Sequence, residues 1–140
     1  MKRKAIGTAL AGMVAATAAI FGTSSPAMAA PVRSDACGAW ACGSATFTFS
    51  GDKLSINPIS LSVRDPLCNN GNKAFVLFEV DYVTGANWVT PKRRYDDDPC
   101  DGSPATFSMS KASNGRIISR ARVIVADNVN GNIYGNWRNA

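Results

Sequence analysis

The chain has 140 residues, 46% of them hydrophobic and 18% charged, with a formal net charge of +5 and no histidine. Because histidine is absent, Ser-His-Asp catalysis, Cys-His catalysis, histidine-ligated zinc and the usual histidine general base are all excluded. The basic run Lys92-Arg93-Arg94 is followed almost at once by Asp96-Asp97-Asp98. Nucleic-acid binders concentrate lysine and arginine on one surface, so no nucleic-acid partner is expected.

The first thirty residues are typical of a secretory signal peptide. Lys2-Arg3-Lys4 form a basic region, residues 9–21 an apolar region, and Ala27-Met28-Ala29 a small-residue cleavage site. We therefore expect residues 1–29 to be removed and residues 30–140 to form a single secreted, extracellular domain. Removing three of the fifteen basic residues leaves twelve against ten acidic ones, a net charge of +2. The apolar region is shorter than the roughly 20 residues that span a bilayer, so no stable membrane anchor is expected.

All four cysteines lie in the expected mature domain: Cys37, Cys42, Cys68 and Cys100. An even number of cysteines in a small exported chain predicts a disulfide framework. Three pairings are possible, and the short glycine-containing bend between the first two cysteines favours Cys37–Cys42 together with Cys68–Cys100. A four-thiolate zinc site is the alternative, but structural zinc ligands usually come in close pairs, and neither Cys68 nor Cys100 has a nearby partner.

From Ser44 onward, apolar residues recur with a period of two, which indicates strands that bury one face. Residues 44–50 alternate in this way, and the alternation continues at Leu54 and Ile56. It then changes phase, with the next apolar positions at Ile59, Leu61 and Val63. Because proline cannot donate to a central ladder, Pro58 at the phase change predicts a bulge or a crossing between two sheets.

Residues 73–83 form the strongest strand candidate, and we expect it to be central because its first half is apolar on both faces. Further strands are predicted at 105–109, 117–125 and 133–137, with Ile117 on the inward face of the second. Asn-Gly pairs beside these segments suit tight hairpin turns. The pattern predicts an all-β fold: a two-sheet antiparallel β-sandwich of six or seven strands, stabilised by disulfides.

The segment 85–104 has no sustained alternation and is predicted to be an irregular surface loop. Long ordered loops on rigid sandwiches are frequent binding sites. Aromatic and arginine side chains supply much of the energy of interfaces, so the predicted binding residues are Trp88, Arg93, Arg94 and Tyr95. Trp137 alternates with Ile133 and is expected to pack in the core or at its rim.

Four aspartates, Asp96, Asp97, Asp98 and Asp101, fall within six residues and are calcium candidates because calcium prefers clustered carboxylate oxygens. The spacing is not that of an EF-hand, since Pro99 and Ser108 stand at ligand positions. The alternative is a solvated acidic turn balanced by the nearby basic run. This alternative is preferred, so no metal and no cofactor are expected.

Glu79 and Asp81 lie on one face of the predicted central strand and are the carboxylate pair open to glycosidase chemistry. They are spaced by about 7 Å in an extended chain, which falls between the separations of retaining and inverting enzymes. The preferred interpretation is an exposed acidic strand face whose cross-strand partners are Arg120 and Arg122.

Several segments together resemble the small exported proteins of actinomycetes, a largely uncharacterised group. They are the signal peptide, Leu61 to Asp65 leading to Cys68-Asn69-Asn70-Gly71, the run from Asp97 to Gly102, and Ile117 to Val125 followed by Gly135-Asn136-Trp137. The resemblance implies an exported β-domain that carries disulfides. It assigns no catalytic residue.

The expected function is that of a secreted, monomeric, non-enzymatic module that binds an extracellular glycan or protein partner through its loops. The first alternative is a proteinase inhibitor that presents Arg93-Arg94 on a loop tethered by Cys100. The second is a small hydrolase that works without histidine, through Glu79 or an aspartate.

Overall fold

The computed structural model describes residues 29–68, 71–98, 100 and 102–140. The predicted signal peptide therefore lies outside the described residues, apart from Ala29. Among the described residues, no helix is long and apolar enough to cross a membrane.

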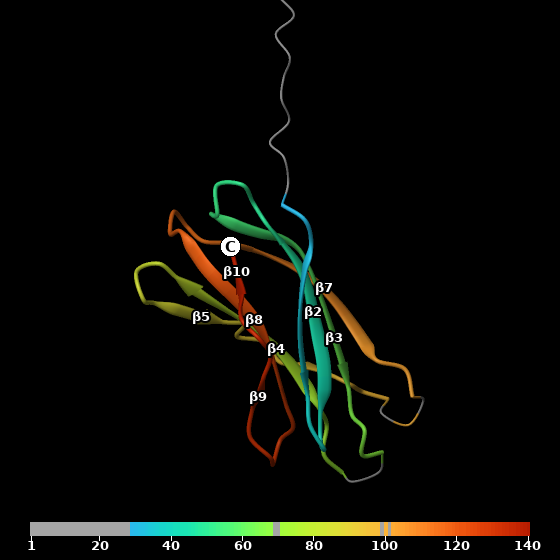
Figure 1. Cartoon of the computed structure of the whole chain (residues 1–140). Helices are drawn as coiled ribbons and strands as arrows, with labels where there is room; N and C mark the ends of the chain where they lie inside the picture. The colour runs from blue at the N-terminus through green and yellow to red at the C-terminus, as the bar shows by residue number, and fades with distance from the viewer. Residues whose placement is uncertain (1–28, 69–70, 99, 101) are drawn as a thin grey trace, which may run out of the picture.

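Two antiparallel sheets form a sandwich (Figure 1). The four-stranded sheet has the order β1 (Val32–Cys37), β2 (Cys42–Phe49), β3 (Ser55–Arg64) and β7 (Ala105–Ala112). The six-stranded sheet has the order β10 (Arg138–Asn139), β8 (Ile118–Ala126), β4 (Phe75–Tyr82) and β5 (Asn87–Val89), with β6 (Arg94–Tyr95) also paired to β4 and β9 (Ile133–Tyr134) to β8. The predicted all-β, disulfide-stabilised sandwich is confirmed. Five of its six long strands carry the alternation visible in the sequence, and four strands of two or three residues add to them within the described part of the chain.

The hydrophobic core lies between the two sheets because each long strand turns alternate residues inward. In β4, Val76, Phe78 and Val80 are fully buried. Phe47 of β2 meets Phe78 edge to face, with ring centroids 4.9 Å apart, so aromatic packing joins the two layers. The prediction that 73–83 is a central strand is confirmed, since β4 lies between β8 and the pair β5 and β6.

The phase change at Pro58 is a bulge within one strand. The pairing of β3 with β7 shifts between Ile56 and Ile59, around the cis Asn57-Pro58 bond. Ile56 and Ile59 are both fully buried, so the irregularity restores the inward position of the apolar residues. Of the two alternatives left open by the sequence, β3 therefore adopts the bulge and stays in the four-stranded sheet.

Strand β1 was not predicted, because its inward positions carry Ser34 and Ala36 in place of large apolar residues. The buried Ser34 hydroxyl donates to the carbonyl of Asn136 at 2.8 Å and accepts the amide of Val123 at 3.2 Å. Gly135 approaches this point so closely that an added Cβ would lie 2.5 Å from the Ser34 oxygen. The hydrogen bonds of Ser34 and the close approach of Gly135 thus hold β1 against the C-terminal segment.

Two further predictions need correction. Ile117 is 51% exposed and Ile118 takes the buried position, because the pairing of β4 with β8 shifts between Asp81 and Tyr82. Asn114-Gly115 forms a turn with positive φ angles of 54° and 83°, but it joins β7 and β8, which belong to different sheets, so it is not a hairpin. Asn130-Gly131 does join paired strands, β8 and β9.

The favoured cysteine pairing is confirmed. Cys37–Cys42 links the adjacent ends of β1 and β2, and Cys68–Cys100 links the segment after β3 to the segment after β6. These disulfides fit an extracellular protein.

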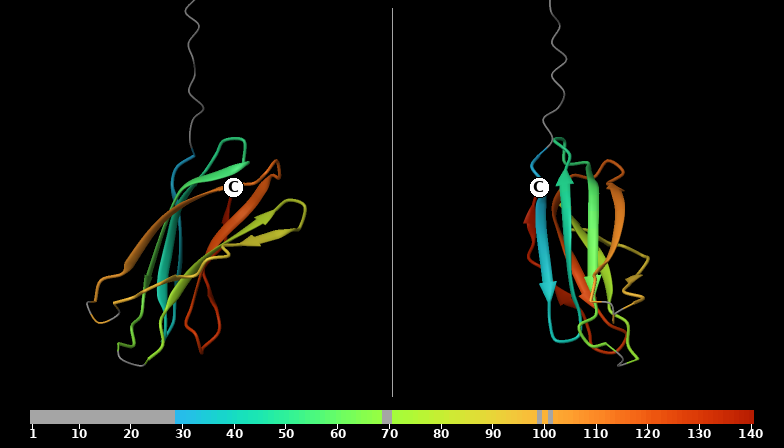
Figure 2. Two further views of the ribbon diagram at one scale, coloured as in Figure 1. Left: turned by 180° about the vertical axis from the view of Figure 1, so that it is seen from behind. Right: turned by 90° about the vertical axis from the view of Figure 1, so that its right-hand side faces the viewer.

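The predicted irregular loop 85–104 contains two short strands, β5 and β6, which form the border of the six-stranded sheet beside β4. The right-hand view of Figure 2 shows β7 at the border of the nearer sheet, while the segment of β5 and β6 lies in the farther layer and reaches past it. On this side of the sandwich the two sheets face each other without strand pairing between them.

Candidate binding site

The side of the sandwich between β7 and the β5–β6 segment, here called the open edge, is closed by side chains. Its residues are Trp88, Arg94, Phe107, Met109 and Lys111, all of intermediate exposure. The Lys111 ammonium lies 4.3 Å from the centroid of the Trp88 ring, and the Arg94 guanidinium carbon lies 5.6 Å from that of Phe107. Each contact joins one sheet to the other, and in each a cation covers an aromatic face.

At the lower end of the open edge lies a cavity of about 280 Å³, here called the acidic pocket. Its lining includes the aromatic residues Tyr95 and Phe107, the acidic residues Asp96–Asp98, and Ser103. The Tyr95 ring packs edge to face against the Phe75 ring, with ring centroids 5.6 Å apart. The pocket therefore combines aromatic surface with carboxylate and hydroxyl oxygens.

The three aspartates of the pocket have different roles. Asp96 is buried and accepts the backbone amide of Asp65 at 2.8 Å. Asp97 accepts a hydrogen bond from the Lys73 ammonium at 2.8 Å. This hydrogen bond and the negative charge of Asp97 raise the pKa of Lys73. Asp98 is exposed, and no hydrogen bond or ion pair to another described residue engages it, so its charge is available to a ligand.

The calcium prediction receives no geometric support from the part of the chain that is described. Within that part no three acidic, cysteine or histidine side chains come together as metal ligands. Asp96 and Asp97 are held by different protein groups, and Asp101 lies outside the described residues.

Of the predicted binding residues, Tyr95 lines the acidic pocket, whereas Trp88 and Arg94 belong to the open edge. Trp88 packs against the hydrophobic core, so its position on an exposed loop was wrongly predicted. Arg94 lies in β6, and its Nε is buried without a hydrogen-bond acceptor in the described structure. Arg93 is exposed and lies over the ring of Phe75, with its guanidinium carbon 4.6 Å from the centroid.

The predicted cross-strand ion pairs exist on the outer face of the six-stranded sheet. Arg122 Nε donates to Glu79 at 2.7 Å, and Arg120 Nε donates to Asp81 at 2.9 Å. Glu79 is only 7% exposed, however, so the prediction of an exposed acidic face is wrong for this residue. Both carboxylates are engaged by arginines, an arrangement that suits a structural role.

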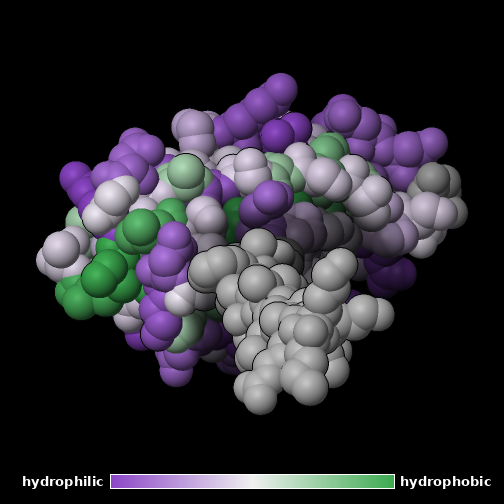
Figure 3. Space-filling view, turned by 90° about the horizontal axis from the view of Figure 1, so that it is seen from above, coloured by the Kyte–Doolittle hydropathy of each residue, from purple (hydrophilic) through white to green (hydrophobic). Residues whose placement is uncertain are grey.

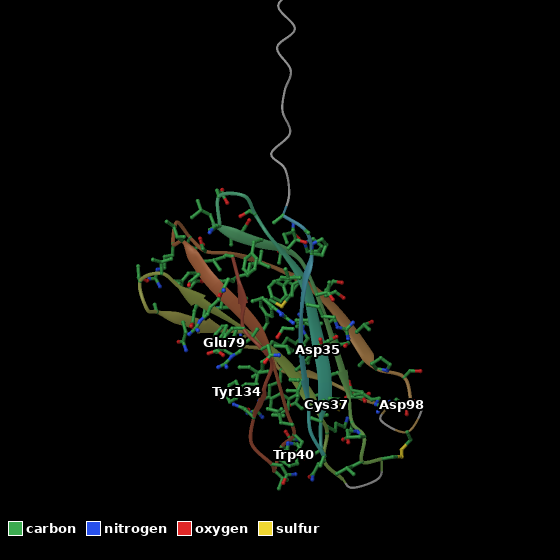
Figure 4. The ribbon with its side chains drawn as sticks, viewed as in Figure 1. Asp35, Cys37, Trp40, Glu79, Asp98 and Tyr134 are labelled. Carbon is green, nitrogen blue, oxygen red and sulfur yellow. A yellow bond between two sulfur atoms is a disulfide. The ribbon has the colours of Figure 1, made fainter. Side chains whose placement is uncertain are left out.

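Aromatic rings cover these arginines. The Arg122 guanidinium carbon lies 4.2 Å from the Tyr134 centroid and 4.1 Å from that of Trp137, and Arg120 lies 4.2 Å from Trp137. Trp137 is therefore on the outer face of the sheet and not in the core. Figure 4 shows Glu79 and Tyr134 on this side of the molecule and Asp98 on the opposite side, near a disulfide.

Two other surface features are present. A second pocket of about 300 Å³ lies beside Cys37–Cys42 on the outer face of the four-stranded sheet, with Arg33, Asp35 and Arg64 in its lining. At the upper end of the molecule, Val83 and Ile117 are 67% and 51% exposed, and apolar surface gathers on one side of this end (Figure 3). Two aliphatic side chains form a smaller patch than those that mark docking sites.

The sequence did not indicate that Phe107 and Ser103 belong to the same site as Tyr95. The alternating pattern predicted only that Phe107 is an inward-facing residue of a strand. Its contribution to a pocket depends on β7 being a border strand, which the local pattern does not encode.

No protein-family model, no curated protein and no solved structure matches this chain.

Proposed function

We propose that this chain is an exported, monomeric, non-enzymatic binding module whose site is the acidic pocket with the adjoining open edge. The observation that carries the proposal is the combination of Tyr95, Phe107 and the free carboxylate of Asp98 around one cavity of about 280 Å³. Ligand pockets typically pair apolar surface with a few convergent polar groups. The ligand classes that suit this chemistry are an extracellular glycan and a polypeptide.

The frame of the pocket supports a binding role. Cys68–Cys100 ties the segment before β7 to the segment after β3, and β6 holds Tyr95 against β4. A site whose backbone is already ordered loses less conformational entropy when it binds. The predicted signal peptide and the two disulfides together support a role outside the cell.

Several observations favour binding over catalysis and over proteinase inhibition. Histidine is absent, and Glu79 and Asp81 are bonded to arginines. Arg94 is part of a paired strand and the Arg93 guanidinium lies over the Phe75 ring, whereas an inhibitor presents its arginine on an exposed loop that fits the protease cleft.

The test uses the oxidised mature protein on an array of extracellular glycans and an array of tiled peptides. The double variant Asp97→Asn/Asp98→Asn removes two of the three aspartate charges that line the pocket, with little change of shape. The control is Asp35→Asn, which removes an exposed carboxylate from the outer face of the four-stranded sheet. Binding that is lost in the double variant and kept in the control supports the proposal. An absence of binding on both arrays, or binding equal in all three proteins, contradicts it.

A further inference from the structure

Strand β7 is a long strand with a free edge. It spans eight residues and pairs only with β3. The other border of the four-stranded sheet is covered, because Ser34 of β1 bonds to the carbonyl of Asn136, and Arg138 donates to the carbonyl of Arg33. The six-stranded sheet ends in β5 and β10, strands of three and two residues. Within the described chain, β7 therefore offers the longest uncovered row of backbone groups.

The register identifies which backbone groups face outward. The Ser113 amide donates to the Leu54 carbonyl at 2.8 Å, at the end of the β3–β7 pair. Bonded pairs in an antiparallel ladder recur at every second residue, and the bulge adds its extra residue to β3 and not to β7. The odd-numbered residues of β7 thus bond to β3. The N–H and C=O groups of Thr106, Ser108 and Ser110 point toward the free edge.

Border strands are usually protected by proline, bulges, charged side chains or short length. Strand β7 contains no proline, and its only charged residue is Lys111, at its far end. Lys111 turns inward over Trp88 and so protects only the upper part of the edge. The stretch from Ala105 to Ser110 has none of these protections.

We propose that this stretch of β7 binds an extended polypeptide segment as an added strand, with a lysine or arginine of that segment in the acidic pocket. The proposal rests on the proposed binding function and names the ligand class. Main-chain hydrogen bonds give affinity in this mode of recognition, and alternate side-chain pockets give specificity. Side chains on one face of the added strand meet Phe107 and Met109, both half-buried. Side chains on the other face continue the exposed row of Thr106, Ser108 and Ser110.

Charge and shape select this occupant. The pocket lies at the Ala105 end of β7, where Asp98 has a free carboxylate, so a basic residue fits there and an acidic one is repelled. The β5–β6 segment reaches past the β7 border (Figure 2). A second sandwich that paired at this edge would bring its own β5–β6 segment against that of the first.

The probes are fluorescent peptides of about ten residues with alternating valine and threonine and one terminal arginine, or glutamine in its place. Two further peptides carry N-methyl groups on alternate residues. In one peptide the methyl groups lie along one edge of the extended strand, and in the other peptide they lie along the opposite edge. Ser108→Pro removes an outward N–H, and Ser108→Ala is the matched control, since proline is tolerated where the N–H of a border strand faces solvent. Asp98→Asn tests the pocket, and thermal unfolding verifies the fold of each variant.

The arginine peptide is expected to bind wild type and Ser108→Ala with affinities within about twofold, and Ser108→Pro at least about tenfold more weakly. Asp98→Asn weakens binding of the arginine peptide and leaves that of the glutamine peptide unchanged. If Ser108→Pro unfolds, the N-methylated peptides decide, because only methylation of the edge that faces β7 abolishes strand addition. Equal binding of both methylated peptides overturns the proposal, as does unchanged binding by a folded Ser108→Pro variant.

The outcomes also separate this proposal from the function on which it rests. If glycans bind in a pocket-dependent manner and no peptide binds, the binding module stands and strand addition fails. If neither class binds, both fail. A dimer in sedimentation that Ser108→Pro dissociates shows that a second copy takes the edge, which overturns the peptide as its occupant.

Discussion

Glu79 and Asp81 lie two residues apart on the same face of β4, yet their ion pairs differ in exposure. The side chains of Arg122 and Glu79 are 20% and 9% exposed, whereas those of Arg120 and Asp81 are 44% and 22% exposed. Removing one partner of a buried pair leaves the other charge without compensation. Exposed pairs contribute little because water screens them. The same kind of contact is therefore expected to differ in energetic weight along one strand.

Glu79→Gln is expected to lower the free energy of unfolding by about 2–3 kcal/mol, somewhat less than a fully buried pair, because Arg122 keeps some contact with water. Asp81→Asn is the matched control and is expected to cost about 0.2–1 kcal/mol. Urea unfolding of both variants at neutral pH measures the difference. Equal losses would show that the burial of Glu79 has no energetic weight.

The carboxylate of Asp127 orders the turn between β8 and β9. It accepts hydrogen bonds from the amides of Val129 and Asn130 and from the Asn130 side chain. Burial alone raises the pKa of Asp127, but the hydrogen bonds from Asn130 and Val129 outweigh burial, so the pKa is lowered. The folded state therefore favours the ionised carboxylate more than the unfolded chain does.

Because the folded pKa is below the unfolded value of about 3.9, the stabilisation from Asp127 is present above that pH and is lost as pH falls through the folded pKa. Asp127→Asn is expected to lower the melting temperature near neutral pH, and the gap to wild type should narrow below about pH 4. Thermal unfolding of both proteins from about pH 7 to about pH 2 measures the gap. A gap that stays constant over this range rules out the ionised carboxylate as its cause.

At the scale of single strands, hydrogen exchange can detect the free edge of β7 without any ligand. The amides of Thr106, Ser108 and Ser110 are expected to exchange faster than those of Phe107 and Met109, because only the latter bond to β3. Slow exchange reflects the protection of a bonded amide in the folded state. Amide exchange followed by NMR measures the alternation along the strand. Uniform protection along β7 would mean that another group already covers this edge.

A strand can be predicted from the sequence when its inward positions hold large apolar residues that alternate with polar ones. Strand β4 was predicted with its faces because large apolar residues alternate along it. Strand β1 was missed because serine and alanine occupy its inward positions, and β5 and β6 are too short for any period to show. The site was predicted in part. Tyr95 and the aspartates lie in the expected segment, but Phe107 joins them only through the order of strands in the sheets, which no local pattern determines.

At the scale of the whole molecule, the two disulfides close loops of different length. Cys68 and Cys100 are 32 residues apart, and Cys37 and Cys42 are 5 apart. Restricting a longer loop removes more entropy from the unfolded chain, so the loop model assigns about 3.7 kcal/mol to the first disulfide and about 2 kcal/mol to the second.

Replacing Cys68 and Cys100 together by alanine is expected to destabilise the protein more than replacing Cys37 and Cys42. Chemical unfolding of the two double variants gives the comparison, and peptide mapping of the unreduced wild type verifies the pairing. The reverse order would show that the local disulfide contributes through the β1–β2 pairing and not through loop entropy.

Both ends of the folded domain lie away from the acidic pocket. The first described residues and the C-terminus lie at the upper end in Figure 1, where the Lys53 ammonium donates to the carbonyl of Ala140 at 2.9 Å. Asp98 lies toward the lower end in Figure 4. A surface or a fused protein attached at either terminus therefore leaves the pocket facing solvent. The domain can therefore be attached to a sensor chip, a bead or a carrier with the acidic pocket left accessible.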